Sequence, residues 1–190
     1  LYPVKLLEKS IHFEARPVSL KQYLLRPDKC GIIAEIKRRS PSKGVINPYV
    51  SIERTSIGYM QAGAAALSIL TDEKYFGGSN DDLTTARQFN FCPILRKDFM
   101  IDEYQVIEAK SIGADVILLI AAGLSSDRIR ALAALARSLG MEVLLEVHHE
   151  KELQGNLIEE VDLIGVNNRD LGTFGVSPEI SKKLSEKIPD

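Results

Sequence analysis

The sequence predicts an α/β fold of the TIM (β/α)8-barrel type, and two observations support this prediction. Short apolar runs alternate with helix-like segments along the chain, which is the pattern of parallel strands joined by right-handed crossovers. Polar residues recur at the carboxyl ends of several of these runs, and a barrel gathers those ends into one ring. An open doubly wound sheet also fits the alternation, but no Gly-x-Gly-x-x-Gly turn follows the first strand. The barrel is therefore the preferred prediction.

Six apolar runs are predicted to be strands buried on both faces, because each is short and rich in Ile, Val and Leu. They cover residues 31–36, 65–70, 92–96, 115–120, 142–147 and 162–166. Helices are expected over residues 52–62, 81–88, 103–111, 126–139, 150–154 and 178–187. The helix over 126–139 has the clearest apolar stripe, with Ser126 or Asp127 as its N-cap and Gly140 at its stop position.

The chain is divided into two parts by the start of the first strand. Residues 1–28 are predicted to form a helical extension, in which Ser19 caps a helix over residues 20–25. Residues 29–190 supply strand–helix units 1–6 of a single barrel domain. A closed eight-stranded barrel needs two further units. We therefore expect the chain to be a fragment or the ordered part of a longer protein.

Composition narrows the classes of protein to which the chain can belong. The chain has 190 residues, of which 45% are hydrophobic and 26% charged, and a formal net charge of −2, as in ordinary globular domains. Near-neutral charge gives no general attraction to nucleic acid or to an anionic membrane. No apolar run approaches the ~18–20 residues of a membrane span. Without a secretory signal, and with Cys30 and Cys92 expected to be free thiols, the chain is predicted to be cytoplasmic.

Charged residues lie at the carboxyl ends of three odd-numbered strands. Because strand side chains alternate between faces, Glu35 and Lys37 share the inward face of the first strand. Lys97 and Glu146 take that face on the third and fifth strands, and alternate strands feed one layer of a barrel interior. Two carboxylates and two ammonium groups balance in charge and form a candidate acid–base cluster. The alternative is a network of salt bridges that only fills the barrel.

The segment after the first strand is rich in positive charge. Residues 37–44 hold Lys37, Arg38, Arg39 and Lys43 beside two serine hydroxyls and a glycine. Such a loop can bind a phosphate and close over it as a lid. The alternative is an ordinary solvated basic loop.

Two phenylalanines are candidates for the wall of an aromatic binding site. Phe76 precedes two glycines after the second strand, and Phe99 comes shortly after Lys97. Either ring fits the hydrophobic core equally well. The adjacent His148 and His149 are predicted to lie in a surface turn, because neighbouring side chains point in different directions and do not converge on one metal.

Five stretches of the chain resemble the indole-3-glycerol-phosphate synthase family, in the same order and at compatible spacing. They are residues 33–44 (IAEIKRRSPSKG), 70–79 (LTDEKYFGGS), 93–99 (PILRKDF), 144–148 (LLEVH) and 164–171 (IGVNNRDL). The resemblance covers nearly the whole chain. It implies a (β/α)8 barrel that needs neither a metal nor an organic cofactor. It also implies conversion of 1-(o-carboxyphenylamino)-1-deoxyribulose 5-phosphate into indole-3-glycerol phosphate, carbon dioxide and water.

The resemblance also implies a role for each candidate residue. Lys97 would be the general acid during ring closure, and Glu146 an acid/base in the later loss of water. Lys37 would hold the substrate carboxylate and is a second candidate proton donor, while Glu35 would hold the substrate and tune the lysines. Ser40 would help to bind the phosphate, and Asn167 and Arg169 would complete the polar wall. To these contacts the residue pattern adds Phe76 and Phe99 as the candidate aromatic wall.

The partner implied by the resemblance is a small phosphorylated aromatic molecule, with no nucleic acid and no membrane, bound by a protein that is monomeric when complete. The family pattern continues with two more strand–helix units and their phosphate loops, which this sequence does not contain. Phosphoribosylanthranilate isomerase is the nearest alternative enzyme, but it requires a cysteine/aspartate acid–base pair. From a different class, the chain could be a catalytically inactive barrel fragment that acts as a binding or oligomerising module.

Overall fold

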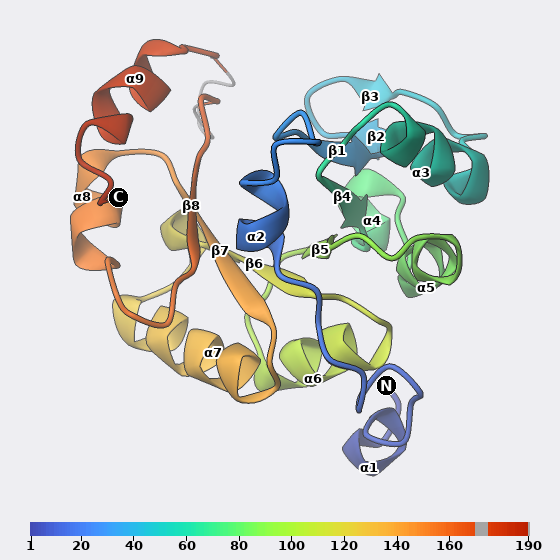
Figure 1. Cartoon of the computed structure of the whole chain (residues 1–190). Helices are drawn as coiled ribbons and strands as arrows, with labels where there is room; N and C mark the ends of the chain where they lie inside the picture. Colours follow the sequence, from blue (N-terminus) through green and yellow to red (C-terminus); the bar gives the residue numbers. More distant parts are fainter. Residues whose placement is uncertain (170–174, 190) are drawn as a thin grey trace.

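The computed structural model describes residues 1–169 and 175–189, and its centre is one parallel sheet (Figure 1). Asp170 and Leu171 of the fifth family-like stretch therefore lie outside the described residues, as does Asp190. All six predicted strands are confirmed, and they pair in chain order. They are β1 (Ile33–Ile36), β4 (Ala66–Leu70), β5 (Ile94–Lys97), β6 (Val116–Ile120), β7 (Glu142–Val147) and β8 (Leu163–Val166).

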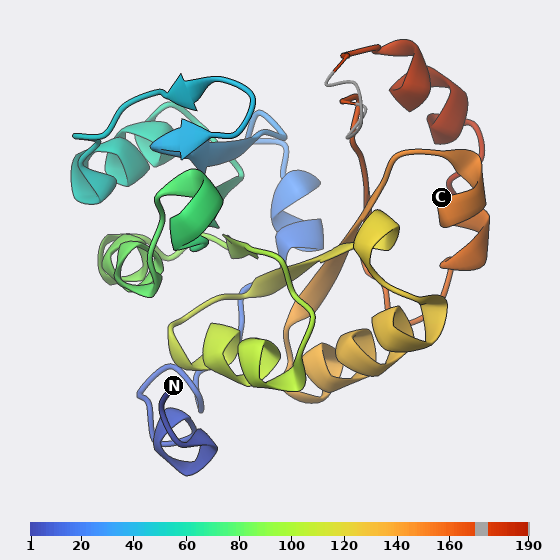
Figure 2. The same cartoon turned by 180° about the vertical axis from the view of Figure 1, so that it is seen from behind.

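The sheet curls, and the larger helices lie on its convex side (Figures 1 and 2). These helices are α3 (Ile52–Gln61), α5 (Asn80–Phe89), α6 (Glu103–Ser111), α7 (Ser126–Ser138), α8 (Glu150–Gly155) and α9 (Glu179–Ser185). Within the described residues, β1 pairs only with β4 and β8 only with β7, so the sheet is an open part of a barrel wall. The fold predicted from the sequence, a TIM-type barrel without its last two units, is thus confirmed.

The predicted N-cap of α7 is wrong by one residue. Ser125 caps the helix, because its backbone is extended and its hydroxyl accepts a hydrogen bond from the Arg128 amide at 3.3 Å. Three hydroxyl or carboxylate residues follow one another here, and only the backbone conformation decides which of them can reach a free amide of the first turn.

The N-terminal segment is less helical than predicted and contains only α1 (Val4–Leu7) and α2 (Leu20–Leu24). Ser19 caps α2 as expected, through the Gln22 amide at 3.1 Å. Helix α2 lies inside the curl of the sheet, where Leu20 is fully buried (Figure 1). The boundary placed after residue 28 remains a prediction.

The hydrophobic core has two layers, one on each face of the sheet. The outer layer packs strand residues such as Leu67, Ile117 and Leu145 against the helices. The inner layer lies inside the curl and joins Leu20 of α2 to strand residues of the opposite face, which are Ala66, Leu95, Val116 and Leu118. Burial on both faces explains why the strands read as continuous apolar runs. The inner layer ends below the carboxyl ends of the strands, where polar side chains begin.

Three short elements lie in the loops at those carboxyl ends. The basic segment after β1 forms a hairpin of β2 (Arg39–Ser40) and β3 (Gly44–Val45). Helix α4 (Glu73–Phe76) follows β4, and the 3-10 turn η1 (Ala121–Gly123) follows β6. No helix within residues 1–169 and 175–189 combines the length and the apolar character that crossing a membrane requires.

The two cysteines are free and differ in exposure, which predicts different reactivity. Cys30 is exposed, whereas Cys92 is buried just before β5, and burial raises the pKa of its thiol to about 11. At pH 8 only about one Cys92 in a thousand is then a thiolate. We expect Ellman's reagent to titrate one thiol in the folded protein at pH 8 and two after unfolding. Folded Cys30→Ser should show no reactive thiol at pH 8. A thiol that still reacts in this folded variant would contradict the assignment of the reactive group to Cys30.

Candidate active site

A cavity of about 950 Å³ opens at the carboxyl ends of the strands. Its lining includes the ends of β5, β7 and β8, the hairpin after β1, and the loops after β4, β5 and β6. The structure brings all the site residues predicted from the sequence to this one cavity: Glu35, Lys37, Ser40, Phe76, Lys97, Phe99, Glu146, Asn167 and Arg169. Residues separated by more than 130 positions in the chain therefore share one surface.

Lys97 and Glu146 form the central contact of the cavity. Lys97 ends β5 and Glu146 lies in β7, so their side chains meet across the intervening strand β6. The Lys97 ammonium donates to Glu146 Oε2 at 3.3 Å, and Asn167 Nδ2 donates to Glu146 Oε1 at 2.9 Å. Each carboxylate oxygen thus has a donor. This arrangement orients the carboxylate and keeps a proton-bearing ammonium group beside it.

Glu35 and Lys37 form a second pair, at the edge of the sheet formed by β1. Lys37 Nζ lies 2.5 Å from Glu35 Oε1, and both side chains are about one-third exposed. The convergence predicted for the four charges is thus resolved into two pairs that face one cavity. Among the described residues, no hydrogen bond or ion pair joins the two pairs. A molecule in the cavity would lie between them.

The basic segment after β1 is divided between two tasks. The Arg38 guanidinium donates to both oxygens of Asp82, which raises the pKa of Arg38, and Nη1 reaches the Gly77 carbonyl at 3.2 Å. Arg39 donates to the carbonyls of Glu73 and Lys74 at 2.7 and 2.6 Å. Both arginines therefore fasten the hairpin to α4 and α5. The hypothesis that the four cations of this segment bind a phosphate together stays a prediction. Of this segment, the cavity lining includes Lys37, Ser40, Ser42 and Lys43 but neither arginine.

Phe76 and Phe99 lie side by side in the cavity lining. Their ring centroids are 6.0 Å apart, and Tyr75 meets the edge of Phe99 at the same distance. The Phe99 side chain is also exposed, which favours a wall of the site over the hydrophobic core. Gly78, two residues after Phe76, allows the close approach of this loop to β4, because a Cβ at this position would lie 2.0 Å from the Leu70 carbonyl oxygen.

His148 lies beside the site without lining the cavity, and its predicted place on the surface is wrong. Its side chain is only 10% exposed, with Nε2 3.7 Å from Glu146 and Nδ1 3.5 Å from Glu152. The available signal was the period of two, which puts Leu144, Glu146 and His148 on one face of the strand. His149 does lie on the surface. Among the described residues, no group of three or more histidine, cysteine or acidic side chains is arranged to hold a metal ion.

Comparison with known proteins identifies one family. The family model described as indole-3-glycerol phosphate synthase matches residues 2–190. Curated proteins of the same name include one from Bacteroides thetaiotaomicron, 49% identical over 98% of this chain and 71% of its own length. The protein from Carboxydothermus hydrogenoformans is 46% identical over 92% of this chain and 67% of its own length. The protein from Chromobacterium violaceum is 51% identical over 85% of this chain and 61% of its own length.

The chain thus spans between 61% and 71% of the length of these relatives. Among solved structures, a carboxyl transferase domain of Rhizobium etli pyruvate carboxylase with pyruvate and biocytin matches with a TM-score of 0.50. It is 12% identical and covers 87% of this chain and 33% of that one. At this level of identity the likeness concerns the fold alone.

Proposed function

The chain belongs to the indole-3-glycerol phosphate synthase family, and on this premise we propose that it carries the acid–base machinery of that lyase reaction. The substrate is 1-(o-carboxyphenylamino)-1-deoxyribulose 5-phosphate. Closure of the pyrrole ring with loss of carbon dioxide and water gives indole-3-glycerol phosphate, the indole precursor in tryptophan biosynthesis. The observation that carries the proposal is the meeting of two acid–base pairs and an aromatic wall in one cavity.

Ring closure needs a proton donor at the ketone of the sugar chain. As the aromatic carbon attacks the carbonyl carbon, negative charge develops on the carbonyl oxygen, and a nearby ammonium group lowers this barrier by giving up a proton. Lys97 is the proposed donor. Support comes from its position in the cavity lining, where its ammonium is oriented by the Glu146 carboxylate 3.3 Å away.

Decarboxylation needs the substrate carboxylate to be held first and then to leave from an apolar setting. Lys37 is the proposed partner of this carboxylate, with Glu35 holding its ammonium at 2.5 Å. The benzene ring would lie against Phe76 and Phe99. Lys37 is also a candidate proton donor, and the division of proton transfers between the two lysines is left open.

Dehydration needs one group that protonates the leaving hydroxyl and one that removes a proton from carbon. Glu146 is proposed to serve here as acid/base, since Lys97 and Asn167 orient its two oxygens. Ser40 is proposed to contact the phosphate, and Arg169 to complete the polar wall with Asn167. These roles use residue types that are all present in the cavity lining.

One chain supplies every residue of this proposed set, which supports a monomer as the catalytic unit. The net charge of −2 supports a protein that does not bind nucleic acid. The free thiols of Cys30 and Cys92 support a reducing, cytoplasmic location.

The direct test is steady-state turnover. The chain is incubated with the carboxyphenylamino-deoxyribulose phosphate, and formation of the indole product is followed by its fluorescence, with the Bacteroides thetaiotaomicron relative as positive control. Product formation by the chain would support the proposal. If the chain forms no product while the control is active, the proposal is refuted for this chain. It would favour the non-catalytic module, for which the open edges at β1 and β8 are the supporting observation.

A further inference from the structure

Arg96 is an arginine on the hidden side of the strand that carries Lys97. The two residues are neighbours in β5, so their side chains point to opposite faces of the sheet. Lys97 lines the cavity, whereas the Arg96 side chain is only 4% exposed and lies between the sheet and α6. A guanidinium removed from water to this degree needs charged and hydrogen-bonding partners.

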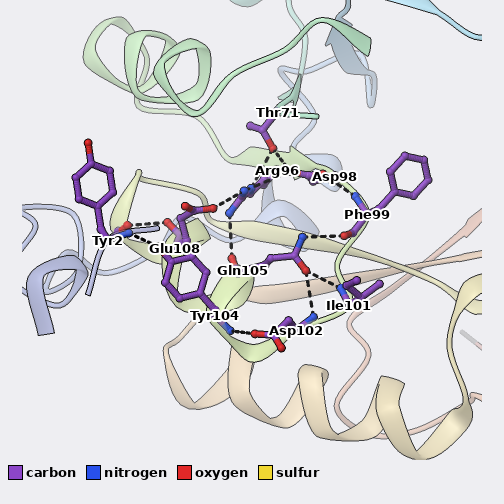
Figure 3. A network of polar contacts seen from close by, with 11 residues as sticks. Tyr2, Thr71, Arg96, Asp98, Phe99, Ile101, Asp102, Tyr104, Gln105 and Glu108 are labelled. Atoms are coloured by element: carbon purple, nitrogen blue, oxygen red, sulfur yellow. Dashed lines mark hydrogen bonds and ion pairs between the residues drawn. The ribbon is translucent and has the colours of Figure 1, made fainter. Parts of the chain in front are cut away.

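The partners of Arg96 come from three different segments of the chain (Figure 3). Its Nε donates to Thr71 Oγ1 at 3.0 Å, in the loop after β4. It also donates to the Gln105 carbonyl at 3.0 Å and to the Glu108 carboxylate at 2.7 Å, both in α6. In the loop after β5 it reaches Asp98 Oδ2 at 3.2 Å. One planar group thus joins both loops to the helix.

Asp98 and Gln105 extend this hydrogen-bond network to the loop of residues 98–102. Asp98 accepts the Thr71 hydroxyl at 2.6 Å and the Phe99 amide at 2.8 Å. The Gln105 side chain donates to the Phe99 carbonyl at 2.8 Å and accepts the amides of Ile101 and Asp102 at 2.8 and 3.1 Å (Figure 3). The loop backbone is therefore held at both its carbonyl and its amide groups. Its residues 98–101 line the cavity.

We infer that Arg96 is a positioning residue, which holds the end of β5 and the loop 98–102 so that Lys97 stays on Glu146 and Phe99 stays beside Phe76. The inference rests on the function proposed for this cavity. Lysine cannot take over the task, because a single ammonium on a flexible chain does not reproduce the planar fork that reaches three segments. A displacement of about 1 Å at the reacting groups is enough to lower a rate by about 100-fold.

Arg87 of α5 supplies a matched control at the other end of the strands, among the residues that precede β5 and β6. It too is largely buried and has three partners: the carbonyls of Gly113 and Asn90, at 3.0 and 3.1 Å, and the carboxylate of Asp115. None of these partners lines the cavity. Arg87→Lys therefore disturbs a comparable buried network without touching the loop 98–102.

The test compares Arg96→Lys with Arg87→Lys in the full-length protein. We expect Arg96→Lys to lower kcat by about 100-fold and to speed amide hydrogen exchange in residues 98–102 by about tenfold or more. Arg87→Lys should lower the melting temperature while leaving kcat and this exchange near wild type. Glu108→Gln, which keeps the shape of the network, serves as a milder second variant and should shift both readouts in the same direction.

Two results would overturn the inference: exchange in residues 98–102 that stays at the wild-type rate in Arg96→Lys, or a fall in kcat that Arg87→Lys matches. Failure of the proposed function looks different, because the wild-type protein itself would then show no turnover. In that case the exchange rates alone decide whether Arg96 holds the loop.

Discussion

Lys97→Met is expected to lower kcat by about 1,000-fold, because methionine keeps the length of the side chain but has no proton to donate. The ammonium faces the cavity and lies 3.3 Å from Glu146, so its loss removes both the proposed acid and the cation beside that carboxylate. The side chain is 27% exposed, and a partly solvated ion pair contributes little to folding. The fold should therefore persist. Initial rates of product formation, together with thermal unfolding, check both statements.

Lys97→Arg separates proton donation from charge. Arginine keeps a positive group opposite Glu146 but holds its proton far too tightly to release it at neutral pH. If Lys97 acts as the acid, both variants lose activity. Wild-type activity in Lys97→Arg would contradict this role and leave only an electrostatic one. In that event the second proposed proton donor, Lys37, becomes the next candidate.

Glu146→Gln is expected to lower kcat by about 100-fold, since an amide cannot accept or return a proton in the dehydration step. The substitution keeps the shape of the side chain, and its oxygen can still accept the hydrogen bond from Asn167, which spans 2.9 Å in the wild type. Lys97 nevertheless loses its anionic partner. Separate values of kcat and KM show whether the loss concerns turnover, as expected, or substrate binding.

Glu103→Gln is the control for this charge change. Glu103 forms an ion pair with Arg128 at the start of α6, its side chain is 47% exposed, and it does not line the cavity. A solvent-exposed pair of this kind contributes little to stability and is remote from the cavity, so kcat should stay close to wild type. Equal losses in the two variants would contradict a special role for Glu146.

The order and type of the main elements could be read from the sequence because burial on both faces leaves a direct trace in it. Each strand is an apolar run, and α7 repeats its apolar residues on one side. The error at the cap of α7 arose because Ser125, Ser126 and Asp127 are all competent caps. The error at His148 was avoidable, since the alternation that points Glu146 inward also applies two residues later.

Arg96 could not have been recognised in the same way. An arginine at the end of a strand reads as a surface residue, because burying its charge is costly without partners. Those partners include Thr71, 25 positions before it, and Glu108, 12 positions after it. The local sequence pattern does not predict that the packing of α6 on the sheet brings these partners to Arg96.

The sequence by itself determined that the chain forms parallel strands with outer helices and that Glu35, Lys37, Lys97 and Glu146 face inward, because alternation along a strand is a local property. Only the tertiary structure decided the pairing, Lys97 with Glu146 and Glu35 with Lys37. It also tied Arg38 and Arg39 to the helices after β4. These outcomes depend on how the sheet curls and on which backbone groups lie within about 3 Å of a donor, and distances between separate segments are not encoded in any local pattern.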